Sequence, residues 1–106
     1  MAVSDRRFAA QLRAEPGGVV HRFDDPGCAL LWIDEQLGEG RRPAELWVRD
    51  RGGQRWLPGL ETGWVAGEHT PMNYGFGAAD AGTGERLGLD EVWESVRARE
   101  RERRGR

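Results

Sequence analysis

The stretch Asp25-Pro-Gly-Cys-Ala-Leu-Leu-Trp-Ile-Asp-Glu-Gln-Leu37 contains the helix signal from which the fold prediction starts. An aspartate accepts hydrogen bonds from the first amides of a helix, and proline is favoured at the position that follows. Leu30, Ile33 and Leu37 recur at the spacing of one helix face. Gly38 then predicts the end of the helix.

Short segments with strand character lie on both sides of this helix. Residues 8–12 and 19–23 flank the turn sequence Glu-Pro-Gly-Gly at 15–18, which predicts a β-hairpin. Residues 45–50 alternate apolar and polar side chains, as a half-buried strand does. Further extended segments are expected at 54–57 and 63–67, around Tyr74, Phe76 and Ala78, and at 85–88.

A second helix is expected from about Asp90. Leu89, Val92, Trp93 and Val96 form an amphipathic stripe, with acidic residues early and arginines late. The fold class predicted from these patterns is α+β, with short, mostly antiparallel strands packed by two helices.

The elements fall into two ββα-type units, residues 8–37 and 74–98, whose shared plan fits a duplication. We expect one domain over residues 1–98, followed by an arginine-rich tail at 99–106 that is helical or frayed. The last ten residues contain six arginines and two glutamates, which gives them a net charge of +4. Because the whole chain has a net charge of −2, residues 1–96 carry a net charge of −6. Such a tail could touch phosphates, but a solvated helix end is the commoner case.

Composition excludes several classes of protein. The chain of 106 residues contains one cysteine, which rules out an internal disulfide and a multi-cysteine zinc site. No apolar stretch is long enough for a transmembrane helix. The negative net charge argues weakly against a nucleic-acid partner. No nucleophile lies beside a paired base, so a small hydrolase is the weakest of the functions considered.

Unusual chemistry is concentrated in residues 69–77, His-Thr-Pro-Met-Asn-Tyr-Gly-Phe-Gly. The thioether of Met72 follows Pro71, whose backbone is stiff, and the imidazole of His69 is near in sequence. Thioether, thiolate and imidazole groups suit Cu(I). An isolated methionine is nevertheless more often a core filler, and an isolated histidine is more often structural. The residues alone leave both interpretations open.

Four segments together resemble the NosL family of copper-binding accessory lipoproteins, which are linked to nitrous-oxide reductase maturation. They are Asp5-Arg-Arg-Phe-Ala-Ala-Gln-Leu12, Phe23-Asp-Asp-Pro-Gly-Cys28, Glu45-Leu-Trp-Val-Arg-Asp50 and Thr70-Pro-Met-Asn-Tyr-Gly-Phe-Gly77. The resemblance covers nearly all of residues 1–98, and Thr-Pro-Met with the glycine-rich segment is its most specific part.

The resemblance implies a Cu(I)-binding or copper-delivery domain that is not an enzyme and that exchanges copper with a partner protein. Met72 would be a metal ligand, with Met1, His69 and Cys28 as further candidates. Met1 matches the methionine of the family's Cys-Gly-Met start, and the preceding Cys and Gly are absent. Asn73 stands where the family often has glycine.

The family is extracytoplasmic and is anchored to the membrane through the cysteine of the Cys-Gly-Met start. Because this chain as given does not contain that cysteine, it is expected to be soluble, in an uncertain compartment. The family fold is similar to that of the organomercurial lyase MerB. Because that lyase relies on a cysteine pair, organomercurial cleavage is not expected here.

The alternative function is a metal-free protein-interaction module of the same fold, with the tryptophans and the glycine-rich loop forming a core and a partner groove.

Overall fold

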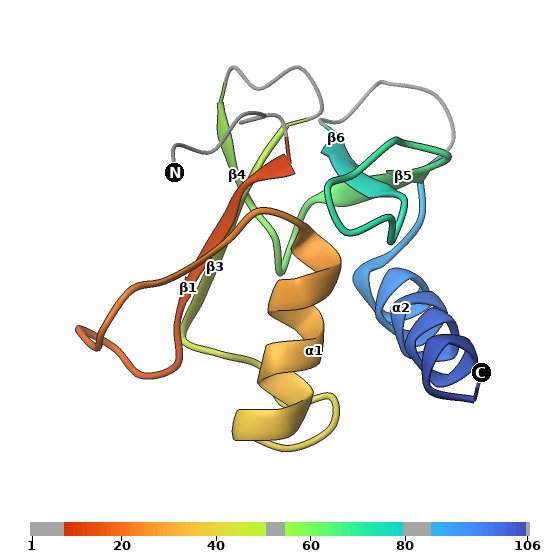
Figure 1. Ribbon diagram of the computed structural model, residues 1–106. Helices are drawn as coiled ribbons and strands as arrows, with labels where there is room; N and C mark the ends of the chain where they lie inside the picture. The colour runs from red at the N-terminus through yellow and green to blue at the C-terminus, as the bar shows by residue number, and fades with distance from the viewer. Residues whose placement is uncertain (1–7, 51–54, 80–85, 106) are drawn as a thin grey trace.

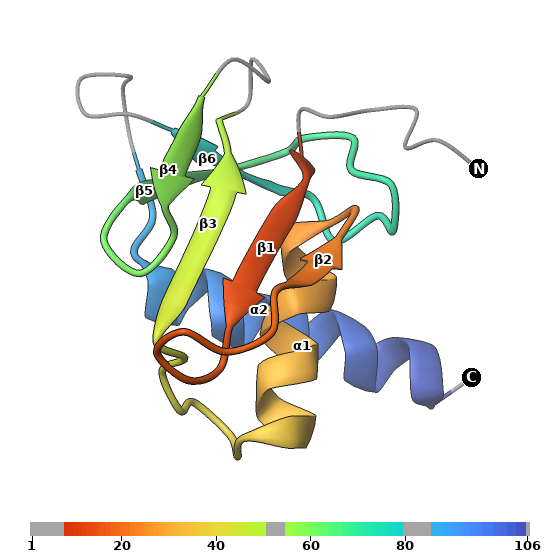
Figure 2. The same cartoon turned by 90° about the vertical axis from the view of Figure 1, so that its left-hand side faces the viewer.

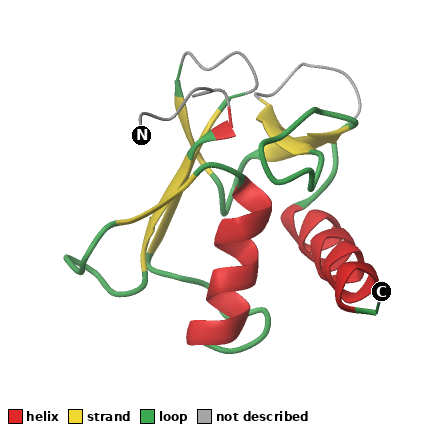
Figure 3. Ribbon diagram, in the orientation of Figure 1, coloured by secondary structure: helices red, strands yellow, loops and turns green. Residues whose placement is uncertain are grey.

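The residues that the structure describes form a small α+β domain of two helices and six antiparallel strands in two sheets (Figures 1 and 3). The α+β class with two helices and antiparallel strands is as the sequence predicted. The computed structural model describes residues 8–50, 55–79 and 86–105. In chain order the elements are β1 (Ala10–Arg13), β2 (His21–Phe23), α1 (Pro26–Gln36), β3 (Glu45–Arg49), β4 (Trp56–Pro58), β5 (Gly63–Ala66), β6 (Phe76–Ala79) and α2 (Leu89–Arg104).

The larger sheet has the strand order β2-β1-β3-β4, with every pair antiparallel. The predicted hairpin of β1 and β2 is confirmed, and the amide of Gly18 donates to the carbonyl of Glu15 (2.9 Å) in its turn. Pro58 directly follows the segment expected at 54–57 and is the last residue of β4. A proline is tolerated there because β4 is an edge strand and needs no amide on its outer side.

The smaller sheet pairs β5 with β6 and precedes α2, which gives the second ββα unit. This unit begins earlier in the chain than residue 74, because Leu87 bridges to Trp64 of β5 and not to β6. Tyr74, expected in a strand, lies in the loop before β6. A parallel bridge between Asp50 and Ala78 joins the two sheets.

Both helices have the ends that their sequences predict. Asp25 is the N-cap of α1, and Gly38 follows the helix with a φ of 116°, a conformation that glycine adopts at low cost. The second helix continues to Arg104, so the described part of the expected tail is helical to that residue. The side chain of Glu91 accepts a hydrogen bond from the Gly88 amide (3.1 Å) at its start.

The core lies between the larger sheet, α1, α2 and the small sheet (Figure 1). Trp64 and Trp93 are almost fully buried, and the predicted stripe of α2 faces inward along its whole length. No helix in the described part of the chain is both long and apolar enough to cross a membrane. The buried apolar residues of the core cluster are Ala10, Leu12, Ala29, Leu30, Ile33, Leu46, Val48, Leu57, Trp64, Tyr74, Phe76, Ala78, Leu89, Val92, Trp93 and Val96.

Candidate functional site

The segment that carries the predicted chemistry is the connection between β5 and β6, residues 67–75, called here the Met72 loop. The carbonyl of Thr70 accepts a hydrogen bond from the Asn73 amide (2.9 Å), which closes a turn around Pro71 and Met72. The buried hydroxyl of Thr70 accepts a second one from the Gly75 amide (3.0 Å). Asn73 and Gly75 have φ values of 63° and 86°, so both occupy the left-handed region.

The carboxylate of Asp25 holds the Met72 loop to the start of α1. Its Oδ1 accepts from the Gly27 amide (2.9 Å), and its Oδ2 accepts from the amides of Met72 (3.0 Å) and Tyr74 (3.4 Å). The side chain is fully buried, and a buried carboxylate needs such donors to offset its lost hydration. Capping was the predicted role of Asp25, and the structure confirms it while adding the contact with the loop.

Gly27 and Tyr74 show how closely the loop approaches α1. A Cβ atom built on Gly27 would lie 2.4 Å from the Cγ atom of the Tyr74 ring. Only a glycine at this position of the first helical turn leaves room for the ring. Tyr74 is buried, and it fixes the loop against the helix by packing as Asp25 does by hydrogen bonding.

Two arginines of α2 hold the opposite side of the loop. The guanidinium of Arg103 donates to the carbonyl of Met72, and that of Arg99 donates to the carbonyl of Asn73 (3.4 Å). Arg103 also lies over the Tyr74 ring, 4.4 Å from its centroid. The residues at the tip of the loop therefore have backbone contacts to both helices.

Met72 itself presents its side chain to solvent. It is 49% exposed, which is unusual for a large apolar side chain in this protein. The alternative interpretation of Met72 as a core filler does not fit this exposure. The backbone of Met72 is held on two sides, while its thioether remains accessible.

Cys28 lies in the first turn of α1, next to the same carboxylate. Its amide donates to the carbonyl of Asp25 (3.0 Å), and its side chain is half-buried. Burial, and after it the negative charge of Asp25, raise the pKa of the Cys28 thiol to about 11. The thiol is therefore protonated at neutral pH, and any metal that it binds must displace its proton.

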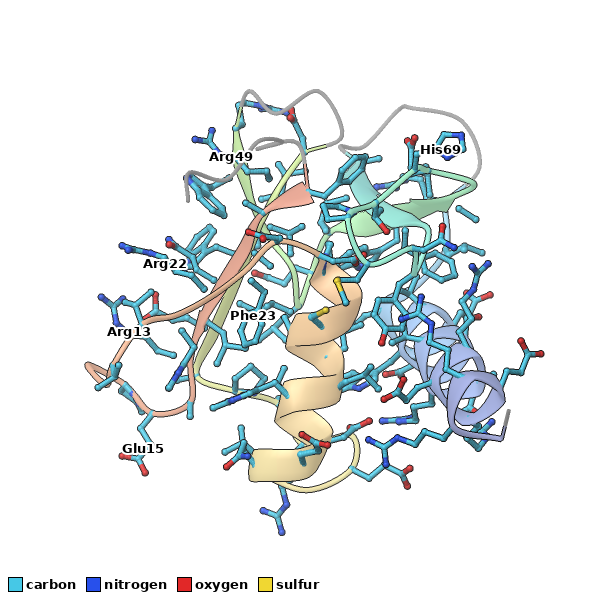
Figure 4. The ribbon with its side chains drawn as sticks, viewed as in Figure 1. Arg13, Glu15, Arg22, Phe23, Arg49 and His69 are labelled. Carbon is cyan, nitrogen blue, oxygen red and sulfur yellow. The ribbon has the colours of Figure 1, made fainter. Side chains whose placement is uncertain are left out.

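The other two candidate ligands are placed differently. His69 is exposed, and Figure 4 shows its ring at the outer end of the loop, pointing away from α1. Met1 lies outside the described residues. The Phe8 ring packs on Gly77 at the start of β6, with 3.2 Å between its Cε1 atom and the position of a Cβ there. The N-terminal end of the described chain thus reaches the strand that follows the Met72 loop.

Across residues 8–50, 55–79 and 86–105, no three His, Cys, Asp or Glu side chains gather closely enough to hold a metal ion. The sequence reasoning missed two contributions to the loop, the second oxygen of Asp25 and the arginines Arg99 and Arg103. An aspartate at an N-cap explains one oxygen only, and nothing in the sequence indicates where the other oxygen points.

No family model, no curated protein and no solved structure matches the chain.

Proposed function

We propose that this protein is a non-catalytic Cu(I)-binding and copper-delivery domain, with Met72 as the exposed ligand and a copper-exchanging protein as its partner. The 49% exposure of the Met72 side chain at the loop tip and the sequence resemblance to the NosL family both support this function. A thioether is a soft ligand that selects Cu(I) over harder ions.

The observation that carries the proposal is that the Met72 backbone is fixed while its side chain is open. Asp25 accepts from the amide of Met72, and Arg103 donates to its carbonyl. Such a position presents a sulfur atom without enclosing it. A delivery protein needs this arrangement, because an accepting ligand of the partner must reach the ion before the donor releases it.

Cys28 is the second candidate ligand, since Met72 and Cys28 both have backbone contacts to Asp25. Its use would release the thiol proton, because the pKa of Cys28 is raised to about 11. His69 would be a third ligand only if the loop tip turns its ring toward Met72. Ligation by Cys28 or by His69 would make Cu(I) binding weaker at lower pH, because protons compete with the metal for the ligand.

Competition of the reduced protein with a chromogenic Cu(I) chelator tests the proposal. Met72→Leu keeps the volume of the side chain and removes only the sulfur. We expect this variant to bind Cu(I) at least about tenfold more weakly, which is a loss of roughly 1.4 kcal/mol. Cys28→Ala and His69→Ala then show which other side chains contribute, and His21→Ala is a matched control for the imidazole.

An unchanged Cu(I) affinity in Met72→Leu would remove Met72 from the site. The alternative, a metal-free protein-interaction module, predicts in addition that Cu(I) leaves the melting temperature of the wild-type protein unchanged. A ligand that binds only the folded state must raise that temperature, so the two functions give opposite results.

A further inference from the structure

The larger sheet has an edge that is open to a further strand. Among the described strands, β2 pairs with β1 alone, so its other side forms one edge of the sheet, called here the β2 edge (Figure 2). The opposite edge of the same sheet is β4. An edge offers its outward-pointing backbone amides and carbonyls to any strand that can align with it.

Strand register shows which backbone groups of β2 point outward. The amide of Arg49 donates to the carbonyl of Ala9 (2.9 Å), so the odd-numbered residues of this strand pair bond to β3. The even-numbered residues of β1 therefore bond to β2, and they lie opposite its two ends, His21 and Phe23. Arg22 lies between these ends, and its amide and carbonyl consequently point away from β1.

The same alternation explains the place of the proline in β4. The amide of Gly59 donates to the carbonyl of Leu46 (2.7 Å), so the nitrogen of Pro58 faces outward. A proline at such a position has no amide hydrogen to offer and blocks the edge. The corresponding outward positions at the β2 edge are Arg22 and, two residues earlier, Val20. Both have an amide, so the β2 edge is not blocked in this way.

Apolar side chains at the β2 edge are incompletely covered. His21 and Phe23 lie beside Trp32 of α1, with 4.4 and 6.1 Å between the ring centroids. Phe23 and Trp32 are only partly buried against the core. Val19, two residues before His21, is 74% exposed, the highest value among the large apolar side chains that the structure describes. The β2 edge therefore combines outward backbone groups with an apolar layer that ends at the surface.

We propose that the β2 edge pairs with the β2 edge of a second copy of this protein, antiparallel and around a two-fold axis at His21. In this register Val20 and Arg22 of one copy exchange backbone hydrogen bonds with Arg22 and Val20 of the other. Val19 lies opposite Phe23 of the other copy, so an exposed apolar side chain covers one that is half-buried. The two four-stranded sheets then form one continuous sheet.

Charge favours this register over its neighbours. Arg22 is the one charged side chain of β2 at neutral pH. A two-fold axis at Arg22 would place the two guanidinium groups directly opposite each other, which is destabilising. An axis at Val20 would place Phe23 opposite the hairpin turn and lose its contact with Val19. The axis at His21 avoids both defects.

A second copy also fits the β2 edge better than an unrelated strand does. The chain itself supplies the apolar side chain that covers Phe23, and its own outward amides match the register. The net charge of the chain is only −2, so two copies repel each other weakly. The proposal is independent of Cu(I) binding, and its tests therefore use the copper-free protein.

Sedimentation equilibrium over a range of protein concentrations tests the association. Strand pairing with a short apolar layer is a small interface, and we expect a weak dimer with a Kd on the order of 10–100 μM. Hydrogen exchange at the amides of Val20 and Arg22 should become slower as the concentration rises. A monomer at every concentration up to about 1 mM, or a dimer that leaves both amides unprotected, would overturn the proposal.

A cysteine at the two-fold axis tests the register. Opposite residues without direct hydrogen bonds have Cα atoms about 4.5 Å apart, a distance that a disulfide can span. In a Cys28→Ser background, His21→Cys should form a disulfide-linked dimer at least about tenfold faster than Gln36→Cys, an exposed control on α1. Equal rates for the two variants, or faster linkage in Arg22→Cys, would contradict pairing around His21.

Substitutions at the two edges of the sheet separate strand pairing from general effects. Arg22→Pro removes an outward amide that β1 does not use, and Val19→Asp places a carboxylate against Phe23 of the other copy. Each should weaken the dimer at least about tenfold. Trp56→Pro removes the matching outward amide of β4 and should leave the dimer unchanged. Urea denaturation checks that each variant is folded, and equal weakening by Arg22→Pro and Trp56→Pro would overturn the proposal.

Discussion

The carboxylate of Asp25 accepts a hydrogen bond from the backbone amide of Met72, 47 residues further along the chain, with 3.0 Å between Oδ2 and the nitrogen. The other oxygen of the same carboxylate caps α1. The start of the helix and the tip of the Met72 loop therefore depend on one side chain. A change at Asp25 should alter both the stability of the protein and the order of the loop.

Asp25→Asn tests this relationship with almost no change in volume. The amide group of asparagine can present only one acceptor, so its NH₂ group would face a backbone amide of Gly27, Met72 or Tyr74. We expect the free energy of unfolding in urea to fall by about 2–3 kcal/mol, because a buried donor loses its partner. Hydrogen exchange should become faster at the Met72 and Tyr74 amides.

Asp24→Asn is the matched control for this substitution. Asp24 is adjacent in sequence but exposed, and we expect its removal to change the free energy of unfolding by less than about 0.5 kcal/mol. Equal stability of the Asp25→Asn protein and the wild type would show that the loop contacts at Asp25 contribute little.

Gly27→Ala tests the close approach of the Met72 loop to α1. Alanine in a helix is favoured over glycine by about 1 kcal/mol, so an uncrowded site would gain stability. At Gly27 the added methyl group would meet the Tyr74 ring, and we expect a net loss of about 1–3 kcal/mol in thermal or urea unfolding. Gly88→Ala is the control for steric crowding alone, because a Cβ there meets only a glutamate oxygen at 3.5 Å, and as the N-cap of α2 this residue gains nothing from the helix propensity of alanine. A gain of stability in Gly27→Ala would contradict the described packing.

The helices and the hairpin could be predicted because their signals are local. Asp25 at an N-cap, Gly38 after a helix end and the buried stripe from Leu89 to Val96 each act within a few residues. The strand pairing of the second ββα unit could not be predicted from local signals. Leu87 and the strand it bridges, β5, are separated by the Met72 loop and β6, and the sequence pattern of Leu87 fits either neighbour.

The candidate site was predictable in its residue types but not in its geometry. The Thr-Pro-Met segment indicated Met72, and the family resemblance added Cys28 as a candidate ligand. The contacts that hold the loop on the side of α2 come from Arg99 and Arg103, which lie in what the sequence indicated as a tail. Alternating Arg and Glu on a helix are typical of a solvated surface, and only the packing angle of α2 brings two of them to the loop carbonyls.

Arg103→Ala should loosen the Met72 loop with little loss of global stability. The guanidinium contacts the Met72 carbonyl and the Tyr74 ring, but it is exposed, so we expect a decrease of only about 0.5–1 kcal/mol in the free energy of unfolding. Hydrogen exchange at residues 72–75 should become faster. Arg101→Ala, which removes an exposed arginine paired with Glu94, is the control and should leave exchange in the loop unchanged.

The ion pair of Asp34 and Arg97 joins α1 to α2 and should make stability depend on pH. Burial acts to raise the pKa of Asp34, but hydrogen bonds from Arg97 (2.8 and 3.1 Å) and the Gly40 amide outweigh it and hold that pKa below its usual 3.8. A lowered pKa in the folded state adds stability above the usual value. That stability is lost as the pH falls through the lowered pKa.

Urea denaturation between pH 7 and pH 2 measures this contribution. Asp34→Asn should lower the free energy of unfolding at pH 7 by about 1–3 kcal/mol and should make the acid side of the pH profile shallower. Glu35→Gln removes an exposed pairing with Arg104 and should do neither. A parallel shift of the Asp34→Asn profile at all pH values would mean that Asp34 contributes nothing to the pH dependence.

Alkylation of Cys28 by iodoacetamide tests the environment that the thiol shares with the Met72 loop. The thiolate is the reactive species, and burial together with the charge of Asp25 raises the pKa of Cys28 to about 11. The rate should therefore be low at pH 7 and still rise about tenfold between pH 9 and pH 10, where the rate of an unfolded cysteine levels off. Mass spectrometry of quenched samples gives the rate, and protein unfolded in urea is the reference.

Removal of the negative charge in Asp25→Asn should lower the pKa of the Cys28 thiol and speed its alkylation, provided that the variant is still folded. A rate that levels off near pH 9 in the folded protein would show that Cys28 is solvated like a free thiol, and its proton would then be no obstacle to binding Cu(I).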